Sequence, residues 1–174
     1  MARVRPSTIE SAHGVLGAAA EAWAEQDGQE VLRSYGFRHG VGHLLSCGRP
    51  QAAEELLTDF AYGMARLKVE NGPGARPLAQ DAGAVKAVDD LADGKAFRTW
   101  EDFLRMRVHI LARGDASWSA ERILLQLAVE HADDSPVTKA AEAWLENGHC
   151  DWLWLRRTRR VAKAVPSACL RVFE

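Results

Sequence analysis

Cysteine and long apolar runs are scarce in this 174-residue chain, and each shortage excludes a class of protein. The three cysteines are odd in number and far apart, so they predict neither a disulfide framework nor a paired Cys-x-x-Cys zinc motif. The apolar runs fall far short of the roughly 20 residues that cross a bilayer. No apolar stretch follows the two arginines of MARVRPSTIE, so we expect no secretory signal. Together these shortages favour a reducing, cytoplasmic setting.

An excess of either charge is also missing. The formal net charge is -2 and the isoelectric point is about 6.3, which favours neither nucleic acid nor an anionic membrane as partner. The sequence has no GxSxG, no phosphate-binding GxxxxGK[ST] and no GxGxxG motif. We therefore expect a protein that is not an enzyme, carries no cofactor, and binds neither nucleic acid nor a membrane.

The sequence does contain a repeated pattern of signals that end one helix and begin the next. An amphipathic stretch is followed by glycine and then by a proline or serine that restarts a helix, as at Gly48 before Pro50 and at Ser135 before Pro136. With 47% hydrophobic residues the chain can bury one core. This pattern predicts an all-α fold, a superhelical array of about seven or eight helices in antiparallel pairs.

Domain boundaries follow from composition. We expect residues 1–163 to form a single helical domain, and NGPGARP at 71–77 to be a loop that could act as a hinge between two halves. Thr99 is expected to cap a later helix with Met106 among its inward residues, and Ala143 is expected to face inward from the last helix. Residues 164–174 alternate apolar and polar side chains, which predicts an extended lead-in to a following domain.

Three side chains with helical spacing suggest a metal site. His39, His43 and Cys47 are four residues apart, so a helix places them on one stripe, as two imidazoles and a thiol that bind zinc would be. The glutamate of an HExxH metalloprotease is missing, because Gly40 follows His39. Gly40 and Gly42 instead suggest close helix packing. We favour a structural role and keep a zinc site as the weaker alternative.

Tryptophans and arginines form the other conspicuous features. Four tryptophans have the helical spacing of core residues: Trp23, Trp100, Trp118 and Trp144. Trp152 and Trp154 could instead pack against a neighbouring domain. The basic cluster at 156–163 could touch nucleic acid, but a solvated linker or an ion-paired domain interface is the favoured interpretation.

Residues 35–67 carry a resemblance to a known family. In this segment Tyr35, the pair Arg38-His39, the pair His43-Leu44 and the turn Gly48-Arg49 precede a helix containing Leu-Leu-Thr-Asp, which ends at Asp59. The segment resembles the helical region after the nucleotide-binding module of STAND-class signalling NTPases, such as apoptotic-protease-activating factor and its bacterial relatives. These are helix-packing motifs, and the ATP-binding residues of that family are not in this chain.

The second half extends the resemblance. Residues 122–157 are similar to the helical stretch that runs up to a WD-repeat propeller in bacterial members, and CLRVFE at 169–174 is similar to the strand that enters the propeller. The resemblance implies a cytoplasmic helical linker or scaffold between the nucleotide-binding module and the propeller, with those domains as partners. It would couple the sensor propeller to the nucleotide switch by rigid-body movement.

The residues expected to matter are structural and lie at the two ends of the array. Two alternatives stay open beside the linker: a free-standing adaptor that binds a protein partner, and the zinc protein. The expected structural residues are Arg38, His39, His43, Gly48 and Asp59 in the first hairpin, and Trp144, Trp152 and Trp154 at the far end.

Overall fold

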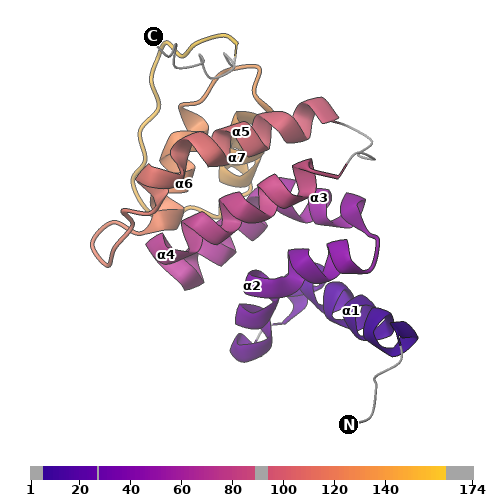
Figure 1. The fold of residues 1–174 in the computed structure, drawn as a ribbon. Helices are drawn as coiled ribbons and strands as arrows, with labels where there is room; N and C mark the ends of the chain where they lie inside the picture. Colours follow the sequence, from indigo (N-terminus) through magenta and orange to yellow (C-terminus); the bar gives the residue numbers. More distant parts are fainter. Residues whose placement is uncertain (1–5, 27, 89–93, 164–174) are drawn as a thin grey trace, which may run out of the picture.

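The computed structural model describes residues 6–26, 28–88 and 94–163, and these residues form helices and connections without a β-strand (Figure 1). The all-α prediction is therefore confirmed, and the extended segment predicted at 164–174 lies outside the described residues. The helices are α1 (Pro6–Glu21), the 3₁₀ helix η1 (Trp23–Glu25), α2 (Glu30–Ser46), α3 (Pro50–Thr58), α4 (Phe60–Lys86), α5 (Gly94–Leu111), α6 (Ala120–Val129) and α7 (Pro136–Glu146).

Helix α4 is the centre of the array. It contacts α2, α3, α5, α6 and α7. Helix α1, in contrast, makes substantial contacts with only one other α-helix of the described residues, which is α2. Figure 1 shows the α1–α2 hairpin at one end of the molecule and α5, α6 and α7 at the other, with α4 between them. Successive helices pack as antiparallel neighbours, in agreement with the predicted array. Among the described residues no helix is both long and apolar enough to cross a membrane.

Helix ends are set by the residues that the sequence pattern singled out. Gly48 and Gly148 adopt left-handed φ angles of 72° and 76° directly after α2 and α7. The side chains of Asp59 and Ser135 accept hydrogen bonds from the backbone N–H of the second residue of α4 and of α7, at 2.9 and 3.2 Å. Pro50 stands in the first turn of α3, where its missing N–H costs nothing.

Helix α4 reverses direction at Asn71 and is in effect two helices. Asn71 has φ 52° and ψ −148°, which interrupts the helix. The Nη1 atom of Arg66 lies 2.7 Å from the Oδ2 atom of Asp81, although 15 residues of continuous helix would separate them by about 22 Å. The prediction of a loop at 71–77 is wrong in extent, because Pro73 and Pro77 lie in helical backbone and only Asn71 leaves it. Pro73 fits there because the helix restarts just before it, at a position whose N–H would have no partner within the helix. Pro77 lies beyond that first turn and gives up one backbone hydrogen bond of the helix.

The reversal is fitted tightly against the α5–α6 connection. The Oδ1 atom of Asn71 accepts a hydrogen bond from the backbone N–H of Ala120 at 2.8 Å. A Cβ atom on Gly72 would lie 2.6 Å from the carbonyl oxygen of Gly114 and 2.7 Å from that of Ala112. Backbone therefore packs directly on backbone here, and only glycine leaves room for it.

The core is apolar and aromatic, and four side-chain predictions fail at its margin. Phe60 packs edge-on against the half-buried Trp144, with ring centroids 6.0 Å apart. Trp118 is 46% exposed because it lies in the loop before α6, outside any helix. Met106 is 40% exposed, and Ala143 also faces solvent. Thr99 does not cap α5, because that helix begins at Gly94.

Substituting Gly72 by alanine tests the backbone contact at the reversal. The Gly72→Ala variant should lose about 1–3 kcal/mol of unfolding free energy, because two carbonyl groups that belong to backbone cannot move aside cheaply. Gly83→Ala, in the same half of α4 with nothing within 4 Å of its Cβ, is the matched control and should gain up to about 1 kcal/mol. Urea unfolding followed by circular dichroism measures both. Equal effects in the two variants would contradict this account of the joint.

Candidate functional site

The residues singled out from the sequence fall in two separate regions. Arg38, His39, His43 and Gly48 lie on α2 or the turn after it, and Asp59 joins α3 to α4. Trp144 lies on α7, and Trp152 and Trp154 lie on the irregular segment that follows it. We call residues 150–163 the strap, because they run in non-helical conformation over α6 and α7. The structure therefore brings no single site together from these residues.

A buried arginine near the α4 reversal links the two halves of that helix. The Arg66 side chain is 0% exposed, and its Nε atom donates to Glu70 Oε2 at 3.1 Å while Nη1 donates to Asp81 Oδ2 at 2.7 Å. Glu70 comes just before the reversal and Asp81 after it. Sequence reasoning missed this cluster, because Arg66 looks like one polar residue of an amphipathic helix until the reversal brings Asp81 next to it.

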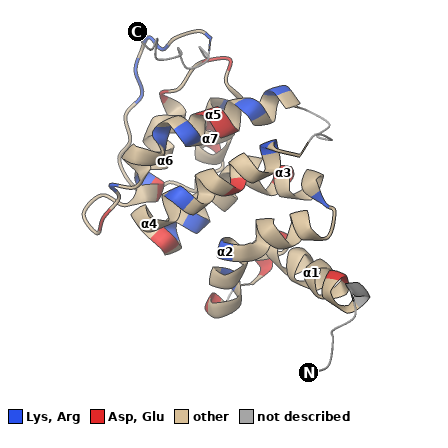
Figure 2. Ribbon diagram, in the orientation of Figure 1, with Lys and Arg blue, Asp and Glu red and all other residues tan. Residues whose placement is uncertain are grey.

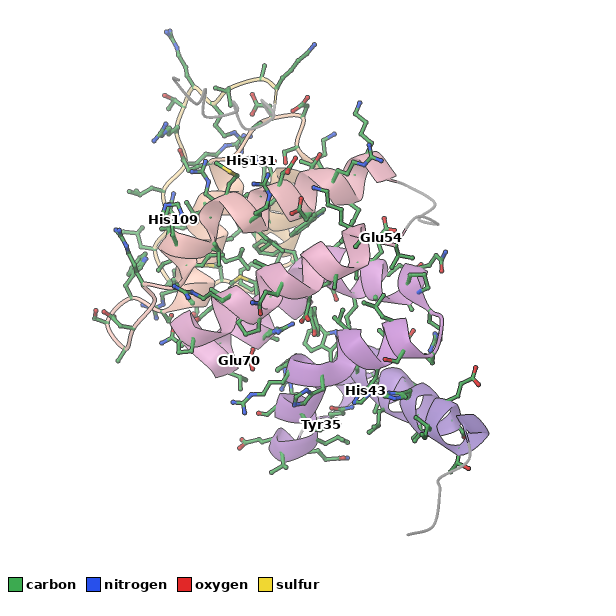
Figure 3. All side chains as sticks on the ribbon, in the orientation of Figure 1. Tyr35, His43, Glu54, Glu70, His109 and His131 are labelled. Carbon is green, nitrogen blue, oxygen red and sulfur yellow. The ribbon has the colours of Figure 1, made fainter. Side chains whose placement is uncertain are left out.

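Arg38 extends this buried cluster to α2. Its Nε atom donates to the second oxygen of Glu70 at 3.0 Å, so one carboxylate joins Arg38 of α2 to Arg66 of α4. Arg38 is 65% exposed at its side chain, whereas Glu70 is 7% exposed. Arg38 thus contacts a neighbouring helix, next to the reversal at Asn71. The sequence did not predict this contact. Figure 3 labels Glu70 at the lower end of α4.

Electrostatics in the cluster favour a charged Arg66. Burial alone would lower the pKa of Arg66, but the neighbouring Tyr62, Asp81 and Glu70 outweigh burial and raise it. Burial raises the pKa of Tyr62 to about 12, although the nearby Arg66 opposes the rise. Tyr62 therefore stays neutral and Arg66 stays cationic over the whole physiological range. Burial also raises the pKa of Asp81, although Arg66 opposes the rise. The ion pairs of the cluster hold the two halves of α4 together.

His43 is occupied on both ring nitrogens. Its Nδ1 atom lies 2.7 Å from Nδ1 of His13 on α1, and its Nε2 atom lies 2.9 Å from the hydroxyl of Tyr35. Tyr35 also packs against the His39 ring, with centroids 4.8 Å apart. Figure 3 shows Tyr35 and His43 close together on α2. His13 was missed in the sequence, because a contact 30 residues away leaves no local signal.

Within the stripe on α2, His43 contacts α1 through His13, whereas His39 and Cys47 contact residues of α2 itself. The Cys47 thiol donates to the carbonyl of Leu44 at 3.3 Å, and in the described ranges no three His, Cys, Asp or Glu side chains are grouped as metal ligands would be. A Cβ on Gly40 would overlap that of Ala20, so this glycine lets α1 approach α2, as expected. Gly42 differs, because a Cβ there would meet nothing within 4 Å.

At the far end the two tryptophans of the strap pack inward. Trp152 and Trp154 are half-buried against the core, and Trp152 lies 6.0 Å from the ring of Trp144. The alternate residues Leu153 and Leu155 point out, at 83% and 69% exposure. This inward and outward alternation is that of an extended chain lying on a surface.

The basic cluster is paired with acidic side chains of α6, α7 and the turn between them. Arg157 Nε lies 2.7 Å from Glu130 Oε2, and the backbone N–H of Arg157 donates to the other oxygen of that carboxylate. Arg160 is 4% exposed and donates to Asp133, to Glu142 and to the carbonyl of Val129, the last residue of α6. Figure 2 colours the basic and acidic residues at this end of the molecule, where the strap runs beside α6 and α7. The arginines therefore bind the strap to the array.

No protein-family model, curated protein or solved structure matches this chain. The function is therefore argued from the geometry, in which ion-paired clusters and one histidine contact join elements that are distant in sequence.

Replacing the buried Arg66 should lower the free energy of unfolding far more than replacing the exposed Arg38. Arg66→Met leaves two carboxylates near the reversal without their shared cation, and should lower the unfolding free energy by about 3 kcal/mol or more. Arg38→Met, on the same Glu70 but largely exposed, should cost about 1 kcal/mol or less. Chemical denaturation of the two variants measures the difference. Similar losses in both would mean that burial of Arg66 contributes little to the fold.

Arg160 should control whether the strap stays bound. In Arg160→Gln the strap loses its contacts with Asp133, Glu142 and α6, so chymotrypsin should cleave the segment around Trp152–Leu155 at least several-fold faster. Arg159→Gln is the matched control, because Arg159 makes no ion pair among the described residues. Mass spectrometry of timed digests locates the cuts. Equal cleavage in both variants would show that other contacts hold the strap.

Proposed function

We propose that this chain is a non-enzymatic helical linker or scaffold of a STAND-type signalling NTPase, which couples a sensor WD-repeat propeller to the nucleotide switch. The resemblance of residues 35–67 and 122–157 to that family suggests the context. Such a linker needs a body that moves as one piece and a firm connection to the domain that it carries. Its partners would be the other domains of the parent chain.

The ion-paired strap is the observation that supports this proposal best. Arg157 and Arg160 bind three acidic residues on α6, α7 and their turn, and Asp133 and Asp134 donate backbone hydrogen bonds to Val161 and Ala162. The chain beyond helix α7 is thus fixed to the array for more than ten residues. A domain attached after the strap would follow movements of the helices instead of swinging on a free tether.

The internal joints support the same role. The Arg66 cluster holds the two halves of α4 together and reaches α2 through Arg38, while Asn71 and Gly72 hold the reversal against the α5–α6 connection. These contacts span the array from the first hairpin to α6. A displacement at one end would therefore be carried through packed helices to the other.

A free-standing adaptor is the second candidate, and a groove beside α2 favours it. A hollow of about 750 Å³ lies between α1 and the start of α2, lined by Leu16, Val31, Leu32 and Tyr35 among others. Val31 is 87% exposed, an unusual position for a large aliphatic side chain at the edge of an apolar hollow. In the adaptor, this groove would receive an apolar segment of a protein partner.

The size of the native polypeptide distinguishes the two candidates. Immunoblotting of lysate from the source cells, with an antibody against this chain, should show a band far above 19.1 kDa if the chain is a linker. A band near 19.1 kDa would overturn the linker and leave the adaptor. Metal analysis of the same protein purified without chelator tests the zinc alternative, for which His43→Ala would have to abolish a stoichiometric metal content.

A further inference from the structure

The contact between His13 and His43 limits how many protons the α1–α2 hairpin can hold. The two Nδ1 atoms face each other at 2.7 Å, which requires one hydrogen between them, on one nitrogen only. With N–H bonds of about 1 Å, two hydrogens would be left roughly 0.7 Å apart. Because the rings come from different helices, any conflict between them acts directly on the α1–α2 interface.

The hydrogen-bond chain accommodates a single added proton. Either Nδ1 atom can carry the shared hydrogen, and the number of protons that the pair holds is the same in both tautomers. In one of them the Tyr35 hydroxyl donates to Nε2 of His43, and Nδ1 of His43 donates its hydrogen to His13. A first added proton can go to Nε2 of His43 if the tyrosine oxygen becomes the acceptor. The site left for a second proton is Nδ1 of His13, which already accepts the hydrogen of His43.

We propose that the His13–His43 contact is a proton-operated latch, in which binding of a second proton separates the amino-terminal part of α1 from α2. The carboxyl-terminal part of α1 stays attached, because Glu21 accepts two hydrogen bonds from Arg49 and Ala20 is buried against Gly36 and Gly40 of α2. Opening would uncover Leu44, which packs beside Gly17 and is fully buried in the closed hairpin. This inference does not depend on the proposed function.

The groups around His43 act in the same direction. Burial, followed by His13 on α1 and His39 on α2, lowers the pKa of His43 below its ordinary value of 6.5. The carboxylates nearest in sequence on α1 are Glu10 and Glu21, and Glu21 is already paired with Arg49. On α4, Asp81 interacts electrostatically with His39, but its carboxylate is already paired with Arg66. The closed hairpin therefore binds fewer protons than the open one, and acid below about pH 6.5 favours opening.

Hydrogen exchange of the full chain at pH 7.5 and pH 5.0 tests the latch, with exposure times scaled for the intrinsic exchange rate at each pH. Peptides from residues 8–17 should lose at least tenfold more protection at pH 5.0 than peptides from α4. Helices α5, α6 and α7 are unsuitable as reference, because burial also lowers the pKa of His131, which bonds to Ser135 and packs against Phe103 of α5. In His13→Gln the second proton has no site, so the loss should fall to threefold or less.

A surface histidine supplies the control variant. A second measurement uses only the wild-type protein, so it tests the latch even if His13→Gln does not fold. His109→Gln removes an exposed histidine of α5 and should leave the acid response of α1 unchanged. NMR titration of the wild-type histidine rings should show the second protonation together with shifts in α1 amides. The latch is overturned if α1 keeps its protection at pH 5.0, if His13→Gln opens as the wild type does, or if both rings become protonated without any α1 shift.

Discussion

The ion pair between Arg66 and Asp81 is the interaction on which the array depends. Bringing a guanidinium fully out of water costs several kcal/mol, and this cost is offset only where carboxylates meet it with good geometry. Glu70 does so from one turn along the same half of α4, whereas Asp81 does so from the other half and can reach Arg66 only because the helix reverses at Asn71. The pair with Asp81 therefore depends on the reversal and in turn stabilises it. Since α4 contacts five other helices, the positions of those helices follow from this one joint.

The sequence could predict what local chemistry decides. Gly48, Asp59 and Ser135 end or begin helices through their own φ angle or their own side-chain oxygen, so their neighbours along the chain suffice to identify them. The all-α class follows from the same signals. Two of the failures have one cause: Thr99 could have capped a helix and Trp118 could have faced a core, had the helices begun where the apolar spacing suggested.

What the sequence could not predict depends on partners distant along the chain. The NGPGARP stretch carries every mark of a loop, yet Pro73 fits a helix because the reversal at Asn71 makes it an early-turn residue. His13 gains its role from His43 on another helix, and the basic run from Arg156 to Arg160 gains its role from acidic side chains 14 to 27 residues earlier. Such pairings exist only once the helices are assembled. The candidate sites of this protein are made almost wholly of them.

The strap also fixes an order of events during synthesis. Arg160 must find Val129, Asp133 and Glu142, which leave the ribosome before it. Contacts across long loops form after local ones, since loop closure has to be offset by structure that is already present. The helices from α1 to α7 can therefore pack before the strap docks, and its docking is a late step. Until that step Glu130, Asp133 and Glu142 lack their arginine partners, and a chain paused there would carry an acidic face whose charge the docked strap neutralises.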